Sequence, residues 1–275
     1  MKELENVVVG AGSIPSLVIT IVFMIAIPVF SLVFWRRKHT TQTNFSYLIA
    51  GALGFLVSAR VLELGVHYFC ILADNPVSRF ISSSTAAYVL YGTLTAGLFE
   101  ECGRFVVFKY IMKKNRTREN AVFYGIGHGG IEILAVLLPS MITYLLIAVL
   151  FSSGKVDVAL RTFKISEETA AAALPSVRAA ASFNFALMAM NVVERVFAML
   201  LHIGLTVIVF HGVVNSKAVF LPLAILLHML MDTFPALYQR GVLPLWSVEV
   251  WAALCTAVVI LIAFKLYRRM EPQNN

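Results

Sequence analysis

Long apolar segments alternate with short polar stretches along almost the whole chain. A helix needs about 20 apolar residues to cross the hydrocarbon core of a bilayer. The pattern predicts membrane-spanning helices at 14–35, 45–72, 84–112, 119–150, 182–213, 217–234 and 246–267. The fourth segment is too long for one straight span, and Pro139 is expected to kink it or end its membrane part. We therefore expect an all-α polytopic bundle of about seven spans, between roughly six and eight, forming a single integral membrane domain over residues 1–275.

One loop, 152–180, is long enough to hold structure outside the membrane. Within it Ser166 precedes two glutamates and a run of alanines, a pattern typical of an N-capped helix. We expect a short amphipathic helix there on the outer surface, acting as a connector between two spans, with a lid as the alternative. The polar motifs discussed below all fall in a core at 84–234.

Composition supports a membrane protein. Hydrophobic residues make up 59% of the chain and charged residues 13%, with a mean hydropathy of +0.83. A soluble domain has about 25% charged residues, so these values exclude a soluble enzyme and a disordered chain. The three cysteines lie far apart without a C-x-x-C pair, which indicates neither a disulfide framework nor a thiolate metal site.

The net charge of +7 comes from basic residues that stand at the ends of the apolar segments. This distribution follows the positive-inside rule and does not form a nucleic-acid-binding stripe. With the N-terminus outside, twelve Lys and Arg residues fall on the inner side and seven on the outer side. The charge pattern therefore predicts an outside N-terminus and an inside C-terminus.

Several ionisable residues lie inside the predicted spans, where each costs several kcal/mol unless it is paired or hydrated. Glu100 and Arg104 in the third span are four residues apart, so they share a helix face and are expected to pair. Glu101 points about 100° away, which leaves it available for another partner. The other such residues are His128, Glu132, Glu194, Arg195, His202, His228 and Asp232.

Two further pairs have the same spacing, His128 with Glu132 and His228 with Asp232, while the adjacent Glu194 and Arg195 are expected to face different neighbours. A lone polar residue in a span often joins two helices. Most of these groups, however, lie about 15 to 22 Å from the inner boundary at about 1.5 Å per residue. That depth is near the middle of a hydrocarbon core about 30 Å thick. A shared depth predicts one polar cavity.

Three kinds of function are compatible with such a cavity. A carboxylate can activate water for hydrolysis, with imidazoles stabilising the oxyanion. Zinc could instead be held by His128, His202 and His228, although the H-E-x-x-H pattern is absent. A proton or ion relay of a transporter is the third possibility, weakened by the lack of an internal repeat.

The motif set resembles that of the YhfC family of bacterial intramembrane peptidases. The resemblance covers about residues 95–235 and rests on Glu100-Glu101-Cys102-Gly103-Arg104, Tyr124 to His128, His202, and His228 with Asp232. That family is grouped with CPBP proteins such as type II CAAX proteases, with PrsW proteases and with the anterior pharynx-defective subunit of gamma-secretase. The E-E-x-x-x-R motif of CAAX proteases is one residue shorter here, so either glutamate can be the base. Their H-x-x-x-N motif is H-x-x-x-D here.

The resemblance implies a CAAX-protease-like four-helix core that hydrolyses peptide bonds with a glutamate-activated water. The implied catalytic residues are Glu100, Glu101, His128, His202 and His228. The implied supporting residues are Arg104, Glu132, Glu194, Arg195 and Asp232. No cofactor is expected, with zinc as the alternative. The expected location is the bacterial cytoplasmic membrane, and the expected partners are a membrane protein or peptide substrate and the lipid bilayer, without nucleic acid. The gamma-secretase relative implies a non-enzymatic scaffold as a further alternative.

Overall fold

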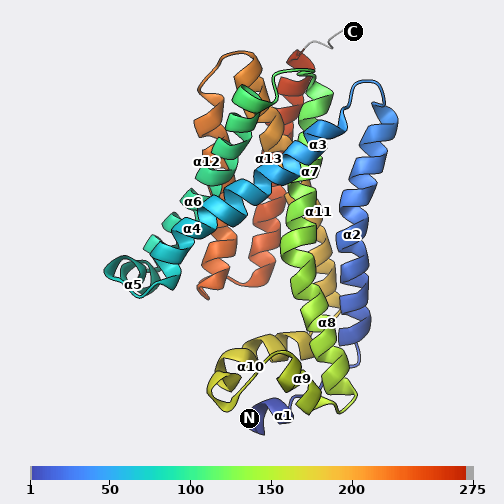
Figure 1. The fold of residues 1–275 in the computed structure, drawn as a ribbon, viewed down its shortest axis with the longest axis vertical. Helices are drawn as coiled ribbons and strands as arrows, with labels where there is room; N and C mark the ends of the chain where they lie inside the picture. The colour runs from blue at the N-terminus through green and yellow to red at the C-terminus, as the bar shows by residue number, and fades with distance from the viewer. Residues whose placement is uncertain (1, 271–275) are drawn as a thin grey trace. The chain divides into compact units, whose positions relative to one another are not determined.

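A computed structural model describes residues 2–270, which form helices and short connections without any β-strand (Figure 1). The α-helices and π-helical segments (η) are α1 (Lys2–Glu5), α2 (Ser13–Lys38), α3 (Phe45–Val57), η1 (Ser58–Glu63), α4 (Leu64–His67), η2 (Tyr68–Leu72), α5 (Pro76–Ser83), α6 (Thr85–Val106), η3 (Val107–Ile111), α7 (Arg118–Glu132), η4 (Ile133–Leu137), α8 (Leu138–Ser152), α9 (Val156–Thr162), α10 (Glu167–Ala181), α11 (Phe185–Val214), α12 (Phe220–Gln239) and α13 (Leu245–Arg269). The predicted all-α class is confirmed.

Within the described residues, six helical runs are long and apolar enough to cross a membrane. They are Ser13–Lys38, Phe45–Leu72, Arg118–Ser152, Phe185–Val214, Phe220–Gln239 and Leu245–Arg269. Helix α6 is not among them, although its 22 residues would span about 33 Å. Its glutamates and arginine lower its hydropathy. The polytopic membrane architecture is confirmed, and a further span through α6 stays a prediction.

The long fourth segment is interrupted where the sequence predicted a kink. Helix α7 passes through the π-helical turn η4 into α8, and Pro139 stands in the first turn of α8. Proline has no N–H to donate and its ring clashes with the preceding turn, which explains why the helix changes register just before it. The interruption begins directly after Glu132, the last residue of α7.

The chain divides into two compact units, of which the first comprises Met1–Ile27 and Ile133–Arg195. Its core lies between α8, α9 and α10 and includes the buried side chains of Ile147, Phe151 and Val177. Helix α10 follows Ser166, whose backbone N–H donates to Thr169 Oγ1 at 2.8 Å. This contact satisfies one of the donors that every helix start leaves free.

The second unit comprises Pro28–Glu132 and Val196–Asn275. In it α3 packs against α7, and α6 packs against α12. The run from α3 through α4 crosses obliquely over α7 and α6 (Figure 1). Aromatic and aliphatic side chains of several helices form its core, among them Tyr47, Phe108, Tyr124 and Phe210.

Glycines allow α3 and α7 to approach each other closely. A Cβ on Gly127 would overlap the backbone carbonyl of Leu48, and one on Gly51 would overlap the carbonyl of Tyr124. Small residues at such contacts let helix backbones meet in a membrane protein. Gly129 plays a comparable part toward α11, because a Cβ there would lie 3.2 Å from the His202 ring. The glycine-rich stretch of α7 therefore brings that helix against two others.

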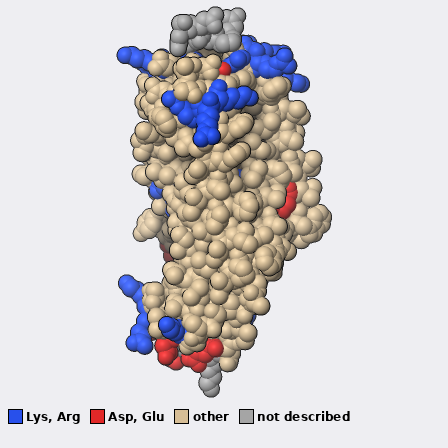
Figure 2. Space-filling model, turned by 90° about the vertical axis from the view of Figure 1, so that its right-hand side faces the viewer, with Lys and Arg blue, Asp and Glu red and all other residues tan. Residues whose placement is uncertain are grey.

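Basic residues of the second unit gather where its helices begin and end. The basic residues 36–38 lie in the last turn of α2, and the basic residues 268–269 lie in the last turn of α13. Arg118 at the start of α7 donates to the Met270 carbonyl at 2.9 Å, which joins two of these ends. In Figure 2, Lys and Arg side chains cluster near the upper end, and the surface directly below them carries few charges.

Candidate active site

Helix α6 contributes two glutamates and an arginine that are all buried. The Arg104 guanidinium contacts Glu101 through Nη1 and lies 3.4 Å from Glu100 Oε2 through Nη2. Positions three and four residues away are both neighbours on a helix, so one arginine can reach both carboxylates. Glu101 contacts Arg104, which the sequence did not predict, but it also has the other partner that was predicted for it, since His228 contacts it. The predicted pairing of Glu100 with Arg104 is found.

Helices α7 and α11 bring their histidines to the same group. His128 Nε2 lies 2.9 Å from Glu100 Oε2, and His202 Nδ1 lies 2.7 Å from Arg104 Nη2. His202 Nε2 lies 2.5 Å from Glu132 Oε2. The predicted pairing of His128 with Glu132 along α7 is thus wrong, because each of these side chains bonds to another helix.

Helix α12 completes the group with His228 and Asp232. His228 Nδ1 lies 2.7 Å from Glu101 Oε1, and its Nε2 lies 3.4 Å from Asp232 Oδ2. The pairing of His228 with Asp232 expected from their spacing is present. His228 therefore connects the fully buried Glu101 to Asp232, whose side chain is 34% exposed.

The neighbours of His202 define its tautomer. A guanidinium can only donate, so Arg104 requires Nδ1 of His202 to accept. The proton of the neutral ring then stands on Nε2 and is donated to Glu132. Nδ1 thereby keeps its lone pair directed toward Arg104 and Glu100, the latter at 3.9 Å.

Some buried polar atoms of this group have no hydrogen-bond partner within the described part of the chain. They are Glu101 Oε2, Arg104 Nε, Tyr124 Oη and His128 Nδ1. Buried polar atoms are nearly always paired, because leaving one unpaired costs about 1–3 kcal/mol. Three of these atoms belong to ionisable residues that contact one another in the group, which indicates a site that receives a ligand or water.

The group also contains a set of donors suited to a metal ion. Ligand atoms of Glu100, His128 and His202 lie within 4.8 Å of one another, and all three residues are buried. Two histidines and a glutamate form a common catalytic zinc site. The contact of Glu132 with His202 matches the carboxylate that usually orients a metal-bound histidine. This set differs from the predicted His128, His202 and His228, since Glu100 takes the place of His228.

Two of the predicted supporting residues are not part of the second unit. Glu194 and Arg195 belong to the first unit and contact each other through Oε1 and Nη2. The sequence did not predict this mutual contact, which forms because side chains of consecutive residues can curl toward each other when both are long.

A second polar chain runs through the second unit. Glu63 is buried and lies 3.3 Å from His67 Nε2, whose Nδ1 lies 2.7 Å from Tyr91 Oη. The four-residue spacing of Glu63 and His67 is the signal that could have revealed this contact.

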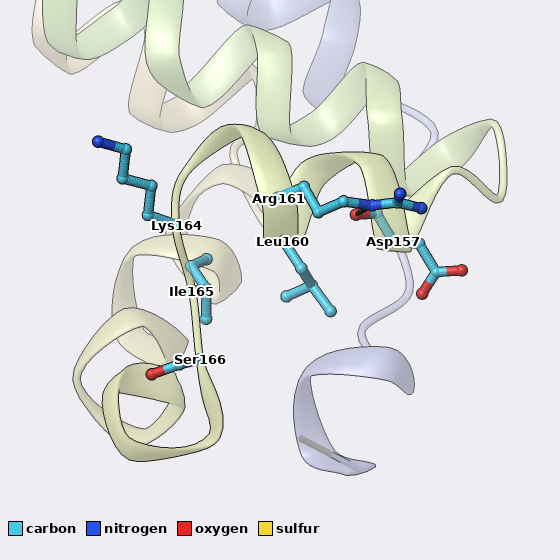
Figure 3. A pocket seen from close by; sticks show the side chains of 6 residues that line it. All are labelled: Asp157, Leu160, Arg161, Lys164, Ile165 and Ser166. Carbon is cyan, nitrogen blue, oxygen red and sulfur yellow. Dashed lines mark hydrogen bonds between the residues drawn. The ribbon is translucent and has the colours of Figure 1, made fainter.

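The first unit has a hollow of its own, lined by Asp157, Leu160, Arg161, Lys164, Ile165 and Ser166 (Figure 3). Its only acidic side chain is Asp157, and no histidine lines it. In Figure 3, the Lys164 side chain points away from Asp157. This hollow lacks the paired acids and bases of the buried group in the second unit.

Comparison with known proteins identifies the family. A family model described as "YhfC intramembrane metalloprotease" matches residues 23–252. The chain is 32% identical over 238 residues to the "Uncharacterized membrane protein YhfC" of Bacillus subtilis (strain 168), which covers 85% of this chain and 88% of that protein. No solved structure gave a significant match. The family description does not support the expectation of no cofactor, and it agrees with the zinc alternative. The chain is an integral membrane protein that belongs to the YhfC family, described as intramembrane metalloproteases.

Proposed function

We propose that this protein hydrolyses peptide bonds of membrane-embedded proteins or peptides at the buried group formed by α6, α7, α11 and α12. The observation that carries the proposal concerns Glu101. One of its oxygens is held by Arg104 and His228, while Oε2 is buried without a partner among the described residues. A carboxylate held in this way can accept a proton. It stands on the same helix as Glu100, a member of the three-donor set.

The donor set fits zinc, and Glu100, His128 and His202 would hold it. Bound zinc would polarise the peptide carbonyl and make water a better nucleophile. Arg104 Nη2 contacts His202 Nδ1, which makes this guanidinium a competitor for that nitrogen. Glu132 holds the His202 ring in the orientation that presents Nδ1 to Glu100.

Glu101 would act as the general base. Its Oε2 takes a proton from the attacking water while the water oxygen bonds to the peptide carbonyl carbon. When the carbon–nitrogen bond breaks, the same proton passes to the leaving amine. Arg104 and His228 keep the carboxylate oriented by bonding its other oxygen. Rigid positioning of this kind supplies a large part of the rate of an enzyme.

His228 and Asp232 would exchange protons between Glu101 and the outside of the group. The imidazole stands between the two carboxylates at 2.7 Å and 3.4 Å. Chains of buried carboxylates and histidines commonly relay protons inside membranes. Asp232 is the exposed end of this chain, so it connects the buried base to water.

The metal set predicts a zinc content that depends on three residues. The purified full-length protein, given one equivalent of zinc and then desalted, is expected to keep about one ion per chain. Glu100→Ala, His128→Ala and His202→Ala are each expected to lose it, because removal of one of three ligands greatly weakens binding. Elemental analysis by mass spectrometry measures the ratio.

His39 follows α2 and provides a control outside the donor set, where it contacts Gln42. His39→Ala should retain zinc as the wild type does. Equal zinc in wild type and His128→Ala, or none in either at micromolar zinc, would refute the metal part of the proposal.

We also propose an outside N-terminus and an inside C-terminus in the bacterial cytoplasmic membrane. Support comes from the basic residues 36–38 and 268–269 at the ends of α2 and α13. A fluorescent protein that matures only in the cytoplasm should glow when fused to the C-terminus. Periplasmic alkaline phosphatase fused there should stay inactive. The opposite pair of results would reverse the orientation.

A further inference from the structure

A cleft of about 430 Å³ opens beside the buried group in the second unit. It lies between α4 with η2, α6 and α12, and its lining includes His67, Tyr91, Gly92, Asp232 and Gln239. This volume falls within the range of ligand-binding clefts, about 300–1,000 Å³. The cleft is therefore large enough for several residues of a peptide.

Asp232 connects the cleft to the proposed hydrolytic residues. Its carboxylate lines the cleft and lies 3.4 Å from His228, which contacts Glu101. Glu101 and His228 are almost completely buried, whereas the Asp232 side chain is 34% exposed. A molecule in the cleft would thus meet the relay at its exposed end.

Polar side chains on the wall of the cleft that faces Asp232 are held in place by hydrogen bonds to other residues. The Tyr91 hydroxyl bonds to His67, and His67 bonds to the buried Glu63. This chain of contacts holds the phenol in place, and the helical run that carries Glu63 and His67 is long and apolar enough to cross a membrane. Gln239 lies at one edge of the cleft, where its Oε1 accepts from Tyr88 Oη at 3.0 Å.

These polar groups satisfy a physical requirement of proteolysis in a membrane. A peptide bond must leave its helix before it can be attacked, and an unwound backbone in hydrocarbon loses its hydrogen bonds at a cost of several kcal/mol each. Unwound backbone is tolerated only where protein groups or water pair with it. A cleft with fixed hydroxyl, imidazole and amide groups next to the relay meets this condition.

We propose that this cleft binds the unwound apolar segment of a substrate, with the Tyr91 hydroxyl bonding to its backbone and with His67 and Glu63 as positioning residues. This inference rests on the proposed peptidase function. The substrate class is a membrane-spanning peptide with a helix-breaking centre. The segment would enter between α4 and α6 and present its backbone to the Asp232 end of the relay.

Two glycines provide a matched test of the location. Gly92 lines the cleft, and Gly65 lies exposed on α4 outside its lining; a Cβ at either position would have no atom within 4 Å. The first atom of a larger side chain therefore meets nothing at either position, which makes both suitable for substitution by tryptophan. Gly92→Trp should fill the cleft and lower kcat/KM about a hundredfold, while Gly65→Trp should leave it unchanged. The substrate probe is a synthetic leucine-alanine peptide of about 20 residues with a central Gly-Pro pair, in vesicles.

Binding is measured separately from cleavage by photocrosslinking. In a Glu101→Gln background, Gly92→benzoylphenylalanine should crosslink to the same peptide and Gly65→benzoylphenylalanine should not. Crosslinks at both positions, at neither, or only to lipid would overturn the cleft assignment. So would full activity of Gly92→Trp, which would leave the peptidase function itself standing. If the wild type cleaves nothing, the peptidase function fails, and the crosslinks still decide whether the cleft binds the peptide.

Tyr91→Phe isolates the proposed hydrogen bond. It should raise KM roughly threefold to tenfold with little change in kcat, because the hydroxyl contacts the bound segment and not the reacting atoms. A Tyr91→Phe variant with unchanged KM, or with a loss only in kcat, would remove Tyr91 from the binding role.

Discussion

Glu101→Gln is expected to abolish peptide hydrolysis while the fold and the zinc content stay as in the wild type. Glutamine has nearly the same shape and can still bond to His228, but its amide cannot take a proton from water. Loss of a general base lowers the rate by about 10²- to 10⁴-fold. The decisive comparison is kcat/KM for a cleaved peptide in vesicles, measured together with zinc per chain.

Two further glutamates make this comparison specific. Glu119→Gln changes a buried glutamate outside the group, where it contacts Arg118 and Tyr267, and it should retain activity. Glu100→Gln should lose activity together with zinc, because Glu100 belongs to the donor set. If Glu101→Gln keeps wild-type kcat/KM, Glu101 is not the base.

The second large effect is expected from Arg104→Met, which removes the only cation that contacts both glutamates in the described structure. Arg104 is fully buried, and in the zinc-free protein its loss leaves Glu100 and Glu101 close together without a fixed positive charge. Breaking a buried ion pair from one side costs about 3–5 kcal/mol. Unfolding in detergent, followed by circular dichroism against denaturant, should show a loss of this size.

Removing the charges of the two glutamates as well distinguishes the effect of unpaired charge on stability from the effect of lost packing. Combining Arg104→Met with Glu100→Gln and Glu101→Gln should recover much of the stability, because no unpaired charge then remains. Arg79→Met removes an exposed arginine that pairs with the exposed Asp74, and it should cost only about 0–1 kcal/mol. An Arg104→Met protein as stable as the wild type would show that the guanidinium does not hold the group together.

The spans and the polar layer could be predicted because both follow from one local property of the sequence. Apolar runs of membrane length define the helices. The basic residues at their ends mark the inner membrane boundary, from which the depth of each residue can be counted. Counting from those ends placed Glu100, His128, His202 and His228 at similar depth. The contacts among these residues in the structure agree with that counting.

The partners within the layer could not be predicted from helix spacing. Arg104 reaches both glutamates because three- and four-residue neighbours lie on the same side of a helix. His128 bonds to Glu100 on a different helix, while the glycines Gly127 and Gly51 bring α7 against α3. The choice of partner depends on how the helices pack against one another. The spacing of residues along a single helix gives no information about this packing.

The π-helical segments and the cleft were also beyond sequence reasoning. Of these segments only η4 could be predicted, because Pro139 follows it directly in the sequence. The run from α3 to η2 contains no proline, yet it changes to π-helix at η1 and again at η2. Its geometry places His67 against Tyr91 and forms one wall of the cleft.

The position of the cleaved bond tests the central claim, hydrolysis inside the membrane at this group, most directly. Purified wild-type protein and Glu101→Gln would be reconstituted into vesicles with a library of membrane-spanning peptides, and the products sequenced by mass spectrometry. We predict new termini within the apolar stretch of the peptides for the wild type and none for Glu101→Gln. Cleavage confined to the polar ends, the same products from both proteins, or no products from the zinc-loaded wild type would contradict it.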